Sequence, residues 1–197
     1  MTRPRVLVVV AGTATEIGKT WVAAAHPRAP RAQGVAVAAR KPAQSFDPED
    51  PAPTDAEVLG AASGEDPSTV CPAHRCYEVA LAPPMAADVL GRPAPMVDDL
   101  IDELRWPDPA VDLGWLETVA WPRSPIAEDA DAVVLAELVE PDVWSWWPTP
   151  GSAPSTPCWC RWRRSPASAW WSLNRFDPAD DLHVRNLRWL RDEASTS

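Results

Sequence analysis

The chain has almost no lysine: Lys19 and Lys41 are its only two, and the other 16 of its 18 basic residues are arginines. An ammonium contacts phosphate as a compact point charge, and a guanidinium is not equivalent there, so the positions of the two lysines are of interest. Basic charge is scarce overall, since the 197 residues carry a net charge of −10. A general nucleic-acid binder is not expected, because that class needs a basic face.

Long apolar runs are also missing, which excludes a membrane span. The early run Val6–Val10 is too short for a signal peptide, so a cytoplasmic protein is expected. Cysteine is sparse, and Cys71 and Cys76 flank His74. No second pair of ligands has a zinc-site spacing, so zinc is disfavoured. The length suits one domain over residues 1–197.

Strand-like and helix-like segments alternate along the chain, which predicts an α/β fold: a P-loop NTPase-like parallel sheet flanked by helices. Thr54 is a candidate N-cap for one of the helices. The expected strands are Val6–Val10, Gly34–Arg40 and Leu113–Val119. One helix is expected to begin at Lys19, and three more are expected over Asp55–Ala62, Met96–Leu104 and Val133–Val139.

The stretch AGTATEIGKT, which follows the first strand, has the context of a phosphate-binding loop. The standard loop has four residues between its two glycines, whereas five separate Gly12 from Gly18. The order of strand, glycine loop and helix nevertheless fits a phosphate-binding loop. We expect Lys19 to neutralise β- and γ-phosphate charge and the Thr20 hydroxyl to contact Mg²⁺; the alternative is a helix start with an incidental lysine.

Three further charged residues are site candidates, and two of them, Lys41 and Glu117, lie near the carboxyl ends of strands, where parallel α/β sheets bind ligands. Lys41 follows the second strand, Glu117 ends an apolar stretch, and Asp55 begins a helix. With Thr20, the two carboxylates are candidate Mg²⁺ ligands, and Lys41 is a candidate for stabilising a transferring phosphoryl group. The alternative is that these residues have no functional role and are solvent-exposed charges at the end of a strand or the start of a helix.

The region Trp144–Trp171 breaks the pattern, with seven of the twelve tryptophans, five prolines and no acidic residue. Its proline spacing argues against a regular helix or central strand. Arginines beside Trp159 and Trp162 suggest a single-stranded nucleic-acid patch, which the acidic chain disfavours. A third interpretation fits better: this segment was translated out of frame. If GC-rich codons are chosen for Trp144–Ser172 and read one base earlier, one allowed result is VVVVADPGLGTINAVLVSVAALARVGVVV. That string has the pattern of a strand, a turn, a helix and another strand.

The loop Gly12–Thr20 resembles that of ATP-dependent dethiobiotin synthetases, which carry Gly-Thr-x-Thr-x-x-Gly-Lys-Thr with the same glycine spacing. Lys41-Pro42 with Ser45, Asp55-Ala56, Glu117 and the stretch Leu81–Ala87 are similar to further motifs of that family. The recovered string GLGTIN also resembles a family segment. The chain departs from the family after Glu117, where Thr118-Val119 replace a glycine-rich turn. By the same resemblance, we expect a C-terminal adenine-binding element to be missing.

The resemblance implies ring closure of 7,8-diaminononanoate with CO₂ and ATP by a Mg²⁺-dependent ligase that acts as a homodimer. The acidic charge and the lack of long apolar runs lead us to expect no nucleic-acid and no membrane partner. It implies catalytic roles for Lys19 and Lys41, and substrate contacts from Thr15, Ser45 and Pro83. It implies metal contacts from Thr20, Asp55 and Glu117. The implied ATP contacts are Glu16, Ile17, Gly18, Lys19, Thr20, Trp21, Asp55, Glu117, Asn174 and Arg175.

Two alternatives remain open. A partition-type P-loop switch ATPase would carry a second lysine near the start of the loop, where Gly12-Thr13 offers none. The other alternative is an inactive, poorly folded product of a frameshifted gene, which the proline-broken segment favours.

Overall fold

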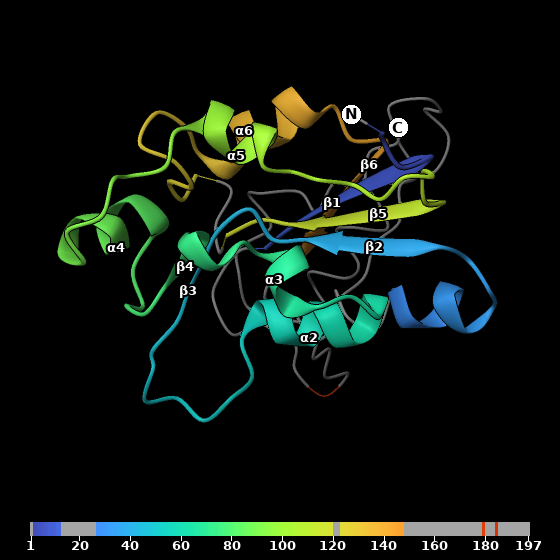
Figure 1. Ribbon diagram of the computed structural model, residues 1–197, viewed down its shortest axis with the longest axis horizontal. Coiled ribbons are helices and arrows are strands. Elements are labelled where there is room, and N and C mark those ends of the chain that lie inside the picture. Colours follow the sequence, from blue (N-terminus) through green and yellow to red (C-terminus); the bar gives the residue numbers. More distant parts are fainter. Residues whose placement is uncertain (1, 13–26, 120–122, 148–178, 180–183, 185–197) are drawn as a thin grey trace.

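The computed structural model describes residues 2–12, 27–119, 123–147, 179 and 184. Within them, β1 (Val6–Gly12), β2 (Val37–Arg40), β5 (Leu113–Glu117) and β6 (Val143–Trp147) form one sheet in the order β2-β5-β1-β6. All three pairings in this sheet are parallel. The expected α/β fold with a parallel sheet flanked by helices is confirmed (Figure 1).

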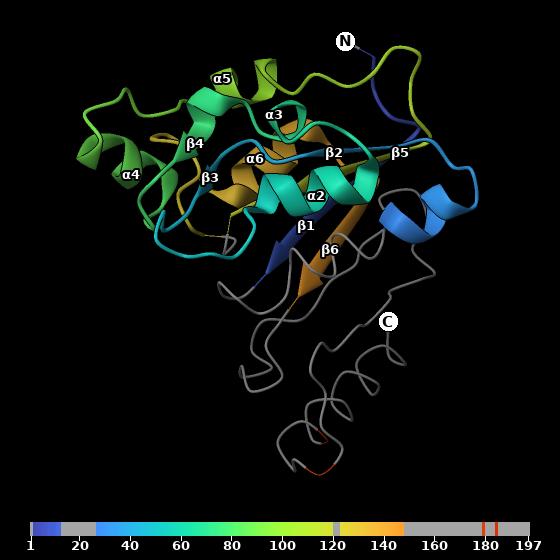
Figure 2. The same cartoon turned by 60° about the horizontal axis from the view of Figure 1, so that its bottom comes forward.

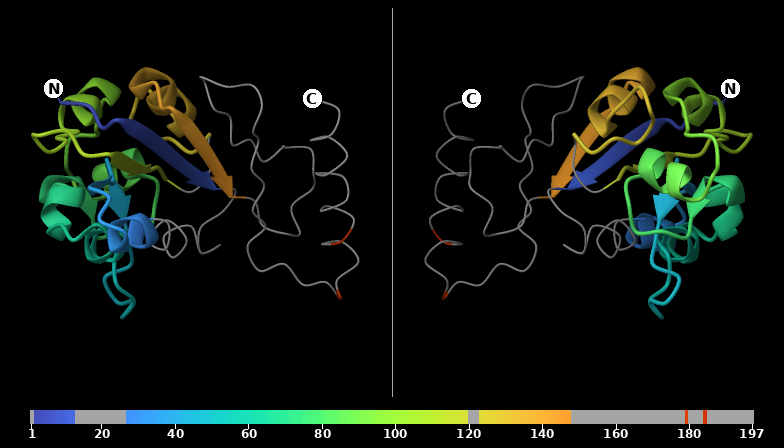
Figure 3. Two further views of the ribbon diagram at one scale, coloured as in Figure 1. Left: turned by 90° about the vertical axis from the view of Figure 1, so that its right-hand side faces the viewer. Right: turned by 90° about the vertical axis from the view of Figure 1, so that its left-hand side faces the viewer.

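Helices cover both faces of the sheet. Successive side chains of a strand point to opposite faces, so each strand contributes residues to both packing layers. On one face, Val8 and Val10 of β1 join a cluster with residues of α2 (Asp55–Ser63) and α3 (Pro67–Val70). On the other, Leu7 and Val9 pack with Ala136 of α6 (Ala132–Val139). α5 (Val97–Asp102) lies beside α6 on this second face, so the sheet is sandwiched between two helical layers (Figures 2 and 3).

A small second unit follows β2. The strands β3 (Gln44–Ser45) and β4 (Cys76–Tyr77) pair in parallel, and the short 3₁₀ helix η1 (Ala73–Arg75) precedes β4. Tyr77 packs with Ala43 and with residues of α4 (Pro83–Val89). This unit lies in the direction in which β2 points, beyond the end of that strand (Figure 1). It therefore borders the edge of the sheet where the candidate site residues gather.

The element boundaries differ from the expected ones by a few residues. The second strand begins at Val37 and not at Gly34, which has a left-handed φ of 83° in a turn. The third strand ends at Glu117 and not at Val119. In place of Met96–Leu104, the helix covers Val97–Asp102, with Met96 at its N-cap position. Residues 27–32 are also helical, although they include two prolines.

β6 extends into the region where the sequence predicts an irregular course. Its backbone pairs with β1 from Val143 to Trp147, so that expectation is wrong for residues 144–147. Trp144 is half-buried and packs against Leu7 and Val9 and their neighbours. The first proline of the region, Pro148, comes after the strand, which explains why proline does not interrupt it. The rest of the tryptophan-rich region lies outside the described residues.

Candidate functional site

The register of the sheet brings the ends of β2 and β5 level with Val10 of β1. In the β1–β5 pair, Val10 lies opposite Glu117, and in the β2–β5 pair Arg40 lies opposite Leu116. The residue after Arg40 is Lys41, so Lys41 is level with Glu117 where β2 ends. The carboxyl ends of parallel strands lie at the same edge of a sheet. Residues that follow different strands therefore come together at one site there.

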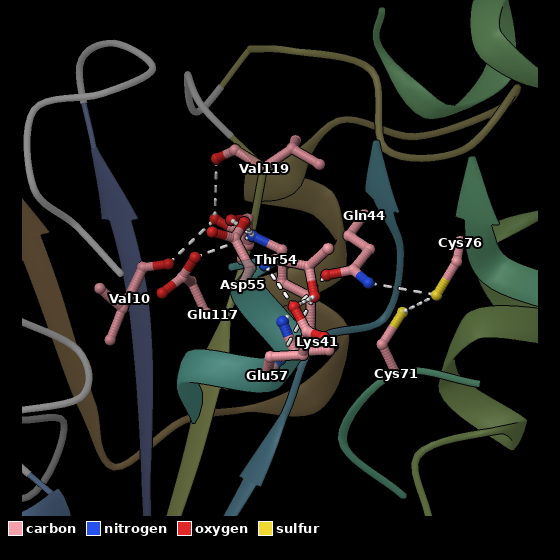
Figure 4. Close-up of polar contacts among 12 residues, drawn as sticks. Val10, Lys41, Gln44, Thr54, Asp55, Glu57, Cys71, Cys76, Glu117 and Val119 are labelled. Atoms are coloured by element: carbon pink, nitrogen blue, oxygen red, sulfur yellow. Dashed lines mark hydrogen bonds and ion pairs between the residues drawn. The ribbon is translucent and has the colours of Figure 1, made fainter. Parts of the chain in front are cut away.

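Lys41 is buried between two carboxylates. Its Nζ lies 2.7 Å from Oδ2 of Asp55 and 2.8 Å from Oε1 of Glu117. It also donates a hydrogen bond of 3.2 Å to the carbonyl oxygen of Thr118. The Lys41 side chain exposes 4% of its surface and that of Glu117 exposes 0%, whereas Asp55 exposes 37%. The cluster is therefore closed on the Glu117 side and open to solvent at Asp55. Figure 4 shows the three side chains and their contacts.

The two carboxylates keep Lys41 charged. Burial by itself would lower the pKa of an ammonium, because desolvation disfavours the charged form. The negative charges and hydrogen bonds of Asp55 and Glu117 outweigh this effect and raise the pKa of Lys41 above its ordinary value. A buried cation with three oxygen acceptors, among them two carboxylates, is a fixed feature of this site at neutral pH.

The helix α2 positions Asp55. Thr54 is its N-cap, and a capping box joins it to Glu57: the Glu57 amide donates to Thr54 Oγ1, and Glu57 Oε2 accepts from the Thr54 amide at 2.7 Å. A cap of this kind fixes the first turn of a helix. Asp55 is the first residue of that turn, where the helix dipole favours a negative charge. The sequence prediction of a helix from Asp55 with Thr54 as its cap is confirmed.

Thr118, the residue after Glu117, connects the end of β5 to β1 by hydrogen bonds. Thr118 is fully buried, its amide donates to Val10 O at 2.9 Å, and its hydroxyl donates to the same oxygen at 3.0 Å. The sequence analysis did not select Thr118 as a site residue, and nothing in its type or spacing marks it. These bonds hold the carboxyl end of β5 against β1, two residues before β1 ends at Gly12.

The remaining candidates fall into two groups. Ser45 lies in β3, half-buried and opposite Tyr77 of β4, and Pro83 is the buried first residue of α4. Both therefore belong to the small unit beyond β2. The second group lies outside the described residues: Thr15, Glu16, Ile17, Gly18, Lys19, Thr20, Trp21, Asn174 and Arg175.

The donor set near Lys41 suits a hard divalent cation, since carboxylate and hydroxyl oxygens are the ligands that Mg²⁺ takes. Oxygens of Asp55 and Glu117 approach one nitrogen atom within 2.8 Å, so both carboxylates already point at a common positive charge. No group of three or more His, Cys, Asp or Glu side chains arranged to hold a metal occurs among the described residues. A third ligand would have to come from elsewhere, and the proposed one, Thr20, lies outside them.

Comparisons with known proteins find dethiobiotin synthetases that are similar to about half of the chain. The chain is 43% identical over 97 residues to the ATP-dependent dethiobiotin synthetase BioD of Caulobacter vibrioides (strain NA1000 / CB15N), an alignment that covers 49% of this chain and 44% of the relative. It is 40% identical over 94 residues to that of Caulobacter sp. (strain K31), covering 47% and 41%. The chain thus matches less than half the length of each relative. No protein-family model matches the chain.

No helix among the described residues is both long enough and apolar enough to cross a bilayer. The fold is that of an α/β protein of the P-loop NTPase-like type, and over about half of its length the chain is related to dethiobiotin synthetases.

Proposed function

We propose that the chain is an ATP-dependent dethiobiotin synthetase, which closes the ureido ring of dethiobiotin from 7,8-diaminononanoate, CO₂ and ATP. The observation that carries the proposal is the Lys41 ammonium buried between Asp55 and Glu117, where β2 and β5 end. The similarity to enzymes of that name supports the substrate class. Under this proposal the protein works in the cytoplasm as a homodimer.

The reaction consists of three steps in which charge must be neutralised and two groups aligned. One amine of the diamine adds to CO₂ and loses a proton, which gives a carbamate. A carbamate oxygen attacks the γ-phosphorus of ATP, the bond to ADP breaks, and a carbamic–phosphoric anhydride forms. The second amine attacks the carbonyl carbon of this anhydride, the ring closes, and phosphate leaves.

Lys41 has the chemistry that the middle step requires, because its ammonium is charged and sheltered from water. In the proposed role it donates hydrogen bonds to the oxygens of the transferring phosphoryl group. Lys19 would neutralise the β- and γ-phosphates within the loop of Glu16, Ile17, Gly18, Thr20 and Trp21, and Asn174 and Arg175 would meet adenine. Thr15, Ser45 and Pro83 would contact the diamine.

The residues that would hold Mg²⁺ are Thr20, Asp55 and Glu117. When bound, Mg²⁺ neutralises negative charge on the phosphates. To donate to a phosphoryl oxygen, Lys41 would have to exchange at least one of its carboxylate partners for that oxygen. Asp55 is the partner better placed to be released, since it is the exposed one of the two.

Product analysis tests the proposal. The chain is incubated with 7,8-diaminononanoate, bicarbonate and MgATP, and dethiobiotin and ADP are measured. ADP release that requires the diamine, with equal amounts of dethiobiotin, is the expected result. ADP release that is unchanged without the diamine would indicate a switch ATPase instead. Lys19→Ala is the matched variant: it should abolish both products and the thermal stabilisation by MgATP.

A second chain, with residues 144–172 replaced by the recovered in-frame string, is assayed in parallel. If neither chain forms dethiobiotin although both melt cooperatively, the proposed function is wrong.

A further inference from the structure

Two cysteine sulfurs lie in contact beside the candidate site. Cys71 directly follows α3, and Cys76 begins β4. Their Sγ atoms are 3.7 Å apart, and both cysteines are free thiols. Pro72 and the 3₁₀ helix Ala73–Arg75 turn the chain back between them, so two residues five positions apart face each other. A disulfide needs a sulfur–sulfur distance of about 2.05 Å, so the two atoms need only a small approach.

The surroundings of the two thiols differ. Cys71 is buried, with 1% of its surface exposed, whereas Cys76 is partly exposed. The hydrogen bond with Cys71 is the main cause that lowers the pKa of Cys76, to about 6, against the opposing effect of burial. The side-chain amide of Gln44, which donates to Cys76 Sγ at 3.2 Å, and the charges of Arg92 and His74 act in the same direction. The hydrogen bond with Cys76, together with burial, raises the pKa of Cys71.

This asymmetry assigns different roles to the two sulfurs. A thiolate is the nucleophile in cysteine chemistry, and selectivity follows thiolate character and exposure. Cys76 has thiolate character and is partly exposed, so an oxidant reacts with it first. Cys71 is buried and protonated, but it lies against Cys76, which is the position that a resolving thiol needs. The arrangement of an exposed thiolate next to a sheltered thiol is the one that redox-sensitive cysteine pairs use.

We propose that Cys71 and Cys76 are an oxidation site at which a peroxide converts the two thiols into a reversible disulfide. The Cys76 thiolate attacks one oxygen of hydrogen peroxide, the O–O bond breaks, and hydroxide leaves, so that Cys76 becomes a sulfenic acid. The Cys71 sulfur gives up its proton and attacks Cys76 Sγ, the S–O bond breaks, and water leaves. Two thiols are oxidised and one peroxide is reduced to two waters; a small thiol reverses the change by exchange.

Gln44 connects this pair to the Lys41 cluster. Its Nε2 donates to Cys76, and its Oε1 accepts from the amide of Ala56 at 2.9 Å. Ala56 follows Asp55, whose carboxylate pairs with Lys41 (Figure 4). A disulfide has no thiolate charge to accept the Gln44 hydrogen bond. Oxidation therefore removes one of the two bonds that fix Gln44 against the first turn of α2.

Peptide mapping of the full chain tests the proposal. The protein is treated with hydrogen peroxide at pH 7, its remaining thiols are alkylated under denaturing conditions, and trypsin is added. Because trypsin cleaves after Arg75, the two cysteines fall on different peptides. We expect the two peptides to be joined, with the loss of two hydrogens, and to separate again after reduction. Cys158 and Cys160 serve as the internal comparison in the same digest.

Single variants and a pH profile assign the roles. In Cys71→Ser, Cys76 should stop at the sulfenic acid, which dimedone traps; in Cys76→Ser, Cys71 should resist peroxide. Iodoacetamide labelling of Cys76 in the reduced chain should have a midpoint near pH 6, and that midpoint should rise in Gln44→Leu.

Three results would overturn the proposal: Cys76 joined to Cys158 or Cys160 instead of Cys71, oxidation of Cys76 only to sulfinic or sulfonic acid, or a labelling midpoint near the ordinary value of about 8.5. The mapping on the unaltered chain decides the question even where a variant fails to fold.

Discussion

The Nζ atom of Lys41 and the Oε1 atom of Glu117 lie 2.8 Å apart, in a pair whose side chains expose 4% and 0% of their surface. The two residues are 76 positions apart in the chain, and the parallel register of β2 and β5 brings them level. Asp55 shares the same ammonium from the first turn of α2. One buried cation thus connects three elements at the edge of the sheet proposed to bind ATP.

Removing one member of this pair should cost far more stability than removing both. Lys41→Met leaves the Glu117 carboxylate buried without its cation, and breaking a buried pair in this way costs about 3–5 kcal/mol. Lys41→Met with Glu117→Gln should recover a large part of that loss. Urea denaturation of the wild type, both single variants and the double variant gives the coupling energy.

The exposed pair of Arg123 with Asp131 provides the control for this cycle. It has the same separation, 2.8 Å, but the Arg123 side chain exposes 81% of its surface. Arg123→Met should therefore change stability little. Equal losses in Lys41→Met and Arg123→Met would contradict the description of Lys41 as a buried, charged centre.

Lys41 should affect the chemical step more than substrate binding. A group that acts only on the transition state lowers kcat without a matching rise in KM. We expect Lys41→Ala to lower kcat by about 10²–10³-fold, the range seen when one charge-stabilising donor is removed, with KM for ATP changing far less. Steady-state kinetics, with a thermal melt to verify folding, provide the measurement. A variant altered only in KM would refute the role.

Glu103 should make stability depend on pH in the acid range. Arg75 donates two hydrogen bonds of 2.8 Å to the Glu103 carboxylate, which lower the pKa of Glu103 below its ordinary value of 4.5. A carboxylate whose pKa falls on folding stabilises the protein above its unfolded pKa, and this contribution is lost as pH falls through the folded pKa.

The matched variant for this prediction is Glu103→Gln. The wild type should be more stable than Glu103→Gln at neutral pH, by about 1 kcal/mol after solvent screening. The difference should shrink below pH 4.5. Urea denaturation at a series of pH values measures it, and a difference that is the same at acid and neutral pH would rule out the ion pair as its source.

Replacing residues 144–172 by the recovered string should improve folding. In the chain as written, Trp144 packs against the small core of Leu7 and Val9, and overpacking costs roughly 1–3 kcal/mol per site. The recovered string places valine there, which suits a parallel strand. We expect a higher melting temperature, less aggregation and more dethiobiotin per mole of protein. Identical melting and identical product formation would show that the out-of-frame hypothesis has no functional consequence.

Local sequence determined three strands of the central sheet, β1, β2 and β5, and the helices α2, α5 and α6, but it did not predict β3, β4, β6, α3, α4 or η1. The β-branched run Val6–Val10 gave a buried strand because its residues fit both covered faces of a parallel sheet. Thr54 and Glu57 set the start of α2 through contacts three residues apart, which a sequence displays directly. Element ends were less certain, as at Gly34 and Val119, because the sheet register and not the local pattern decides where pairing stops.

Only the tertiary structure decided which charges and thiols meet. Sequence placed Lys41, Asp55 and Glu117 near strand or helix ends, but their shared ion pair depends on the register of three separate elements. Spacing also failed to show that Cys71 and Cys76 touch, since that contact depends on the turn at Pro72 and on the β3–β4 pairing. Such contacts join elements distant along the chain, and their geometry is set by how the sheet and helices pack.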